Sequence, residues 1–328
     1  MTLTAKHPSA LIRPFAPEDY QAFVGLHNAV EREHPSTVEE MRHRDDSRDP
    51  KGKFARFVAL MDGTIVAWGA YGQDASMYHP QKFWVGLGVH PEHRRQGIGG
   101  ALYDRLMAAL APFSPLLLRA YAREDRLDAL AFLAARGFAE ESRAWESRLN
   151  PQRFDPSPYG ELDGKMRALG VRIETLAELP YDTPESRRKL FDLDWEVSQD
   201  EPAPEPQTEP DYETWVKNTF ETPNFMPQAY LVAVAGDAYV GMSTLWNSQS
   251  GDGLYNGMTG VIRPYRRHGV ALAMKVRNLL WAKANGYNLI KTWNNTVNRP
   301  MLSINERLGF VKQPADIGFK KIIHEENV

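Results

Sequence analysis

The most constraining feature of this chain is an internal repeat whose two copies lie 172 residues apart. The first copy occupies residues 89–100 and the second residues 261–271. In each copy a β-branched residue ends an apolar run, and a proline, a basic pair and a small-residue turn follow it. A long helical pattern begins directly after each turn. The sequence therefore predicts the same strand–turn–helix unit twice.

The turn in each copy, which we call a cradle, is suited to binding a pyrophosphate. The first turn of a helix carries unpaired backbone N–H groups and a partial positive charge. Glycine or alanine in the turn lets an anion approach the backbone without a Cβ in the way. The residues expected to form the first cradle are Val89, Arg94, Arg95, Gln96, Gly97, Ile98, Gly99 and Gly100. Those expected to form the second are Val261, Ile262, Arg266, Arg267, His268, Gly269, Val270 and Ala271.

The repeat extends well beyond the two cradles. After each cradle helix, whose apolar stripe in the second copy runs from Leu272 to Leu280, the pattern predicts a strand and then a helix that closes on a Gly-Phe pair. Before each cradle the pattern predicts a strand–turn–strand hairpin, at residues 57–67 and 231–241, which are 174 residues apart. Each half also opens with a short strand and a helix. The two halves are therefore expected to be whole domains.

Length and composition agree with two domains. A chain of 328 residues exceeds the size at which a single core usually stops growing, and 42% apolar residues suffice for two cores. We expect domains at residues 9–150 and 166–328, joined by a linker at residues 151–165. The start of this linker is rich in proline and turn-forming residues.

Composition also narrows the partners. A formal charge of −3 gives no general electrostatic reason to bind nucleic acid or an anionic membrane. The absence of cysteine excludes a thiol nucleophile and thiolate metal ligands, and no residue pattern indicates a metal site. No apolar run has the length of a membrane span, and the N-terminus lacks the apolar core of a signal peptide. A cytoplasmic location is expected.

Read as Arg/Gln-x-x-Gly-x-Gly/Ala after a strand, both cradles resemble the acyl-CoA-binding signature of the GNAT acyltransferase superfamily. Arg94, Gly97 and Gly99 fit it in the first copy, and Arg266, Gly269 and Ala271 fit it in the second. The resemblance covers nearly the whole chain. It implies an α/β (α+β) fold of two GNAT-like domains, each with a mixed, mostly antiparallel sheet flanked by helices. It also implies acetyl-CoA as the co-substrate bound at the cradles.

The resemblance implies that the two halves differ in their fitness for catalysis. Many relatives have a glutamate six residues before the valine of the cradle, where this chain has Phe83 and Tyr255. Many also use a tyrosine five residues before the closing phenylalanine, where this chain has Leu133 and Asn305. Leucine cannot donate a proton, whereas Asn305 can donate a hydrogen bond to the sulfur of CoA.

A further asparagine favours the C-terminal half. Asn298 matches the helix-opening asparagine of the superfamily, which can cap the helix and bind the pantetheine arm of CoA, and Arg126 stands at this place in the first half. Residues 292–301 are similar to those of mycothiol synthase and related tandem GNAT proteins, in which the C-terminal domain is the active one. We therefore expect catalysis in the C-terminal half, with the N-terminal half binding CoA or acting as a scaffold.

The remaining catalytic groups are less defined. Tyr255, Glu201 and Asp252 are candidates for the general base, and a water chain ending on a backbone carbonyl is an alternative. The resemblance implies that a backbone amide near Gly88 or Gly260 binds the oxyanion, and these glycines are compatible with a strand bulge.

An acidic stretch at residues 192–213 holds nine acidic residues, four prolines and no Lys or Arg. It is interpreted either as a solvated, mobile loop or as a lid that attracts a cationic amine through Asp200, Glu201 or Glu205.

The resemblance implies acetyl-CoA-dependent N-acetylation of a small-molecule primary amine by direct attack in a ternary complex. The alternatives are a non-catalytic acyl-CoA sensor and an acetyltransferase that acts on a protein amine. The chain is expected to be a monomer, as a pseudo-dimer of repeats, or a homodimer.

Overall fold

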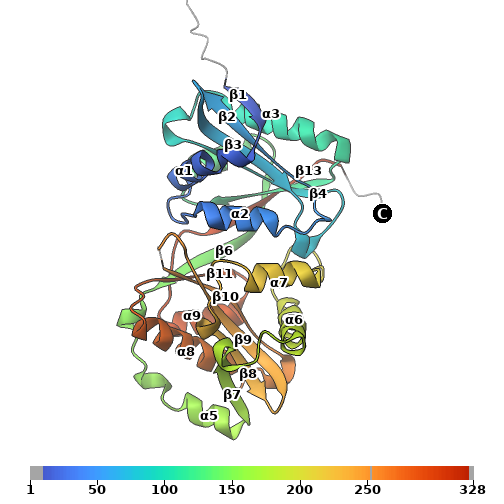
Figure 1. The fold of residues 1–328 in the computed structure, drawn as a ribbon. Coiled ribbons are helices and arrows are strands. Elements are labelled where there is room, and N and C mark those ends of the chain that lie inside the picture. The colour runs from blue at the N-terminus through green and yellow to red at the C-terminus, as the bar shows by residue number, and fades with distance from the viewer. Residues whose placement is uncertain (1–9, 252, 325–328) are drawn as a thin grey trace, which may run out of the picture. The chain divides into compact units, whose positions relative to one another are not determined.

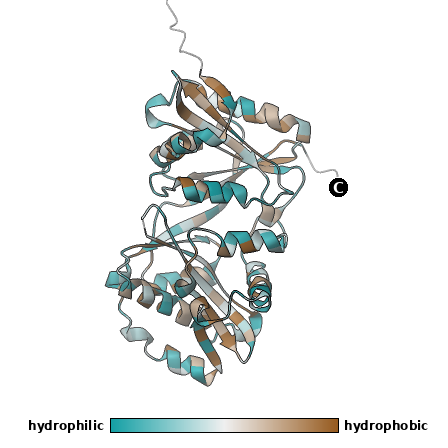
Figure 2. Ribbon diagram, viewed as in Figure 1, coloured by the Kyte–Doolittle hydropathy of each residue, from teal (hydrophilic) through white to brown (hydrophobic). Residues whose placement is uncertain are grey.

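The computed structural model describes residues 10–251 and 253–324, and the chain divides by its contacts into two units. Unit 1 comprises the residues through Ser142 together with those from Ile317 onward, and unit 2 is Arg143–Asp316. Figure 1 shows a sheet flanked by helices in each unit. The strands are mostly brown in Figure 2, while many of the helices carry teal on their outer surfaces. Within the described residues, no helix has the length and hydropathy needed to cross a membrane.

Unit 1 is a mixed sheet with helices on both faces. Its strands, in the order in which they pair, are β1 (Leu11–Pro14), β2 (Phe54–Met61), β3 (Thr64–Gly72), β4 (Lys82–Val89), β5 (Leu117–Arg123) and β13 (Asp316–Ile322). All pairs from β1 to β4 are antiparallel, and β4 pairs with β5 in parallel. One core lies under α1 (Tyr20–Val30) and α2 (Val38–Asp46), and the other under α3 (Ile98–Leu110) and α4 (Leu127–Ala134).

Unit 2 repeats this plan. Its strands, in the order in which they pair, are β7 (Val171–Thr175), β8 (Tyr230–Ala235), β9 (Ala238–Asn247), β10 (Leu254–Val261), β11 (Ile290–Asn295) and β6 (Ala139–Leu149), with the short β12 (Val311–Lys312) on β6. One core lies under α6 (Pro184–Ser198) and α7 (Tyr212–Phe220). The other lies under α5 (Leu162–Ala168), α8 (Val270–Ala284) and α9 (Arg299–Leu308). The predicted hairpins and the mixed sheets are confirmed.

Two strands complete the sheet of the unit other than the one expected from the sequence boundaries. Residues 144–149 of β6 pair with β11 in unit 2, and β13, from the end of the chain, lies beside β5 in unit 1. In both units the parallel strand that follows the cradle helix would otherwise have a free edge of unpaired N–H and C=O groups. Chain segments distant in sequence close these two edges.

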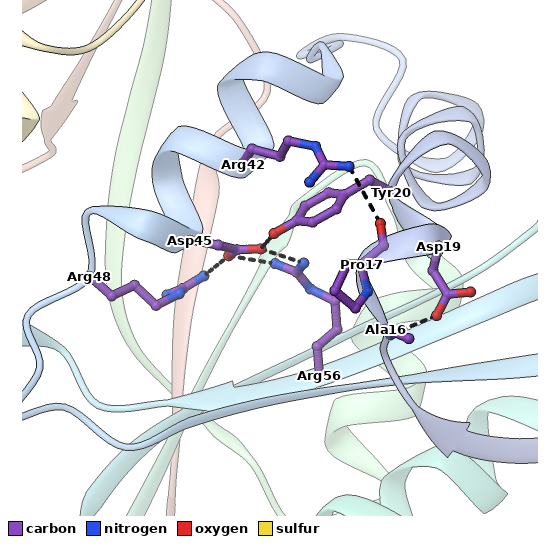
Figure 3. A network of polar contacts seen from close by, with 8 residues as sticks. All are labelled: Ala16, Pro17, Asp19, Tyr20, Arg42, Asp45, Arg48 and Arg56. Atoms are coloured by element: carbon purple, nitrogen blue, oxygen red, sulfur yellow. Dashed lines mark hydrogen bonds and ion pairs between the residues drawn. The ribbon is translucent and has the colours of Figure 1, made fainter.

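A buried ion pair fixes the helices of unit 1 to its sheet. Arg56 of β2 donates two hydrogen bonds to Asp45 of α2, at 2.8 and 3.0 Å, and Tyr20 of α1 donates a third at 2.7 Å (Figure 3). Burial alone would raise the pKa of Asp45, but the hydrogen bonds from Arg56 and Tyr20 outweigh it and the pKa is lowered. The carboxylate therefore stabilises the fold in its ionised form.

Replacing Asp45 with alanine should lower the free energy of unfolding by about 3 kcal/mol, because Arg56 is left buried without its partner. Since the folded pKa of Asp45 is depressed, this contribution is present at neutral pH and is lost as the pH falls below about 4. Urea unfolding at pH 7 and pH 3 measures both effects. The exposed neighbour Asp46→Ala is the control, and an equal loss in the control would contradict the assignment.

Candidate functional site

The two cradles have the same backbone conformation. Arg95 and Gly97 have φ angles of 61° and 83°, and Arg267 and Gly269 have 66° and 86°. Alternating left-handed residues turn successive backbone N–H groups toward one side, which forms a concave site for an anion. In unit 2 the first recorded helical hydrogen bond runs from the amide of Ala273 to Gly269, so the three preceding amides are outside the helical pattern.

One arginine is fixed in the same way in each cradle. Arg94 Nε donates to the carbonyl of Val89 at 3.2 Å, and Arg266 Nε donates to the carbonyl of Val261 at 2.7 Å. These bonds hold each guanidinium between the strand end and the start of the helix. Both cradles thus offer free amides and a fixed positive charge, which are the groups that bind a pyrophosphate.

Behind each cradle a gap opens in the sheet. Strand β4 pairs with β5 only from Lys82 to Trp84, although it continues to Val89. Strand β10 likewise pairs with β11 only from Leu254 to Asn256, although it continues to Val261. A substrate arm with amide groups can hydrogen-bond to the strand edges exposed in such a gap.

Only unit 2 has a bulge beside this gap. Asn256 pairs with Leu245 and Thr259 with Ser243, so β10 holds one more residue than β9 over this interval. In unit 1, β3 and β4 pair without interruption from Ala67 to Gly72. The expectation of a bulge beside Gly88 is therefore wrong, and in unit 2 the bulge lies at residues 257–258, before Gly260 rather than at it.

The bulge also corrects the alignment of the two copies. Leu254 pairs with Ile290 as Phe83 pairs with Leu118, so Leu254 and not Tyr255 is the structural equivalent of Phe83. Tyr255 instead corresponds to Trp84. A constant offset of 172 residues does not hold through a strand that contains one extra residue.

The two asparagines of α9 lie on the face of the sheet covered by α8 and α9. Asn298 caps α9 by accepting a hydrogen bond from the amide of Met301 at 3.3 Å. Asn305 is 2% exposed and donates to Asn294 Oδ1 of β11 at 2.6 Å. Its own Oδ1 is buried and has no hydrogen-bond partner among the described residues. A buried amide oxygen without a partner indicates a group that is absent from this structure.

The corresponding residues of unit 1 have no such function. Arg126 precedes α4 without capping it and donates instead to the carbonyl of Val30 at 3.1 Å. Leu133 is buried in the hydrophobic core beside Phe138. Asn298 and Asn305 therefore have no polar counterpart that could act at a thioester in unit 1.

The other two candidates lie toward the opposite face. The ring of Tyr255 stacks on Trp293, with centroids 5.7 Å apart, and side chains alternate along β11, so Trp293 and Asn294 point to opposite faces. Glu201 follows α6, which packs on β9 and β10. Burial of its carboxyl and the nearby charge of Asp194 raise the pKa of Glu201. The base candidates and the asparagines are thus divided between the two faces, and Asp252 lies outside the described residues.

The acidic stretch contacts the second cradle. Asp200 pairs with Arg266 and, at 3.1 Å, with Arg263, and these arginines lower the pKa of Asp200. Asp200 is therefore neutralised by the cradle and does not attract an amine, contrary to one interpretation of the sequence. The structure also reveals two groups that the sequence patterns did not single out, the buried Lys275 and the Asn256 that it contacts.

Replacing Asp200 with asparagine should raise the affinity for acetyl-CoA about three- to tenfold, because Arg263 and Arg266 lose a competing anion. Calorimetry at two salt concentrations measures this change, which should be smaller at high salt. The matched control is Asp128→Asn, which frees Arg94 in the first cradle. Unchanged or weaker binding in Asp200→Asn would contradict competition at the second cradle.

Comparison with known proteins agrees with this geometry. Residues 19–138 match the acetyltransferase (GNAT) family. Over 154 residues the chain is 30% identical to a mycothiol acetyltransferase of Parafrankia sp. (strain EAN1pec), a match that covers 43% of this chain and 45% of that protein. The chain thus spans less than half of the length of this relative.

Solved structures extend the likeness to the whole chain. A tandem GNAT protein from the clavulanic acid biosynthesis pathway is similar over 97% of this chain and 100% of its own, with 19% identity and a TM-score of 0.74. A GCN5-related N-acetyltransferase from Sphaerobacter thermophilus is similar over 96% of both chains, with 19% identity and a TM-score of 0.66. The predicted tandem GNAT architecture is confirmed.

Proposed function

We propose that this chain, whose fold is that of tandem GNAT N-acetyltransferases, transfers the acetyl group of acetyl-CoA to the primary amine of a small molecule in unit 2. The observation that carries the proposal is the asymmetry between the two units. Both have a cradle and a gap, but only unit 2 adds the bulge of β10 and the polar side chains of α9. Unit 1 retains the means to bind CoA and lacks the groups that act on a thioester.

Each step of the reaction has a place in unit 2. The amides after Gly269 and the guanidinium of Arg266 bind the pyrophosphate, and the gap between β10 and β11 receives the pantetheine arm. The amine nitrogen attacks the thioester carbonyl carbon. A C–N bond forms, the C–S bond breaks, and CoA leaves as a thiolate. An unpaired amide at the bulge stabilises the oxyanion, and a second N–H of Asn305 is available to the sulfur.

The acceptor is proposed to be cationic. Asp194 accepts a hydrogen bond from Trp215 Nε1 at 2.7 Å, and burial raises its pKa. Glu201 is electrostatically coupled to it. Neither carboxylate forms an ion pair among the described residues, so an ammonium group would compensate both charges. Glu201, with its raised pKa, is the better acceptor for the proton that the amine loses.

Release of the CoA thiol by the full chain tests the proposal. Acetyl-CoA is supplied with a panel of primary amines: diamines, amino sugars, amino acids and lysine-containing peptides. Transfer to small cationic amines, with the N-acetyl product identified by mass spectrometry, is the expected result. Tight binding of acetyl-CoA with no transfer to any amine would support a sensor, and transfer to the peptides alone would support a protein acceptor.

Replacing Asn305 with leucine, the residue at the equivalent place in unit 1, should lower kcat about tenfold or more. The change removes the hydrogen bond to the leaving thiolate, while the cradle that binds the rest of acetyl-CoA is intact. Steady-state kinetics should therefore show a loss in kcat with little change in KM for acetyl-CoA. The reciprocal variant Leu133→Asn should have no effect, and a tenfold change in that variant would contradict the division of roles between the units.

A further inference from the structure

A polar cluster is buried between α8 and the sheet of unit 2. We call it the α8 cluster, and its residues are Ser243, Asn256, Thr259, Lys275 and Asn278. Lys275 and Asn278 are each 3% exposed and Ser243 is fully buried. The Nζ of Lys275 donates to Asn256 Oδ1, and Asn278 Nδ2 donates to the carbonyl of Ser243 at 3.1 Å. Asn278 Oδ1 is buried without a partner among the described residues.

Burying this cluster is costly, and the fold does not require it. A lysine removed from water disfavours its ammonium form, and burial lowers the pKa of Lys275 to about 7. In unit 1 the structurally equivalent positions hold largely apolar side chains in the core between α3 and the sheet. These equivalents are Gly69, Val85, Leu87, Tyr103 and Leu106. The same architecture is therefore built with almost no buried polar groups in unit 1.

The α8 cluster is built around the bulge. Asn256 is the last residue of β10 that pairs with β11, and its Nδ2 donates across the bulge to Thr259 Oγ1 at 3.3 Å. The same Nδ2 donates to the carbonyl of Thr244 on β9 at 2.9 Å. Asn256 thus joins the two ends of the bulge to each other and to β9. Among the described residues, Asn256 is the hydrogen-bond partner of Lys275, so Lys275 holds the group that holds the bulge.

We propose that Lys275 is a positioning residue for acetyl transfer in unit 2, where it orients Asn256 and, through Asn256, the bulged backbone of residues 257–258. This inference rests on the proposed function, because the bulge is the place at which an amide meets the thioester oxygen. It explains why a buried amine is retained in one copy of the fold and an apolar core in the other.

The kinetic test uses the full chain and four variants. Lys275→Met keeps the length of the side chain and removes the donor, and it should lower kcat about 10²-fold with KM for acetyl-CoA changed less than about threefold. Asn256→Val, which installs the residue of unit 1, should have the same effect, and the double variant should lose no more than either one. Lys275→Gln restores a donor and should recover part of kcat. Tyr103→Phe, at the equivalent position in unit 1, should leave kcat unchanged.

A readout that does not depend on activity separates this inference from the proposed function. Hydrogen–deuterium exchange of residues 254–261 should be faster in Lys275→Met and Asn256→Val than in the wild type, and unchanged in Tyr103→Phe. Unchanged exchange at the bulge would overturn the positioning role whatever the activity. Loss of kcat together with a lowered Tm, and no rescue by Lys275→Gln, would also overturn it. A wild-type protein that acetylates no amine would contradict the proposed function, and the exchange measurement would still decide the role of Lys275.

Discussion

Replacing Gly269 with glutamate should lower kcat/KM for acetyl-CoA about 10³-fold or more. Gly269 precedes the free amides of α8 and has a φ angle of 86°. A carboxylate about 4 Å from a phosphate charge costs about 4 kcal/mol at an effective dielectric constant near 20, which corresponds to three factors of ten in rate. The same substitution at Gly97 should have a much smaller effect, because unit 1 lacks the groups that act on the thioester.

Gly269 and Gly97 form a closely matched pair for this test. Both have φ angles near 85°, so the strain imposed on a side chain is similar. Gly269→Asn is the control for strain, because asparagine tolerates the left-handed region and adds no charge; it should retain activity to within about tenfold. Equal losses in Gly269→Glu and Gly97→Glu would remove the assignment of catalysis to unit 2. Full activity in Gly269→Glu would remove the second cradle from the chemistry.

The parts of the fold that the sequence predicts are those with local signals. Each cradle combines a strand end, a glycine that must adopt a positive φ angle and a helix start within a dozen residues, and its two copies support each other. The hairpins have turn residues at Asp62-Gly63 and at Gly236, all of which have positive φ angles in the structure. The strands that complete each sheet from distant segments carry no such local signal, because pairing between remote edges leaves no periodicity in either strand.

The sequence did not predict the features that distinguish the active unit, for two physical reasons. A bulge adds one residue to a strand and changes neither its composition nor its apolar content, so Tyr255 was aligned one position too early. A helical stripe is counted on apolar residues, so Lys275 and Asn278 were passed over although both are buried, while Leu280 was included although it is 40% exposed. A polar residue inside an apolar stripe is ambiguous until the strand facing it is known.

Lys275 should also give unit 2 an unusual dependence of stability on pH. The folded pKa is about 7, well below the unfolded value of 10.5. Between these two pKa values the unfolded chain binds more protons at this site than the folded chain, so stability rises with pH. The wild-type free energy of unfolding should therefore gain about 2 kcal/mol from this group between pH 7 and pH 9. Lys275→Met has no titrating group here and should lack that gain.

The comparison of the two proteins isolates the lysine from all other titrations. At pH 7 the buried amine costs the wild type on the order of 4 kcal/mol, and the variant recovers this less about 1–3 kcal/mol for leaving Asn256 Oδ1 unpaired. Lys275→Met should therefore be more stable than the wild type at pH 7 by about 1–3 kcal/mol, and this advantage should disappear by pH 9. A variant that is less stable at pH 7 would show that Lys275 supports the fold. A variant that is more stable and nearly inactive would show a lysine retained for function against its cost to stability.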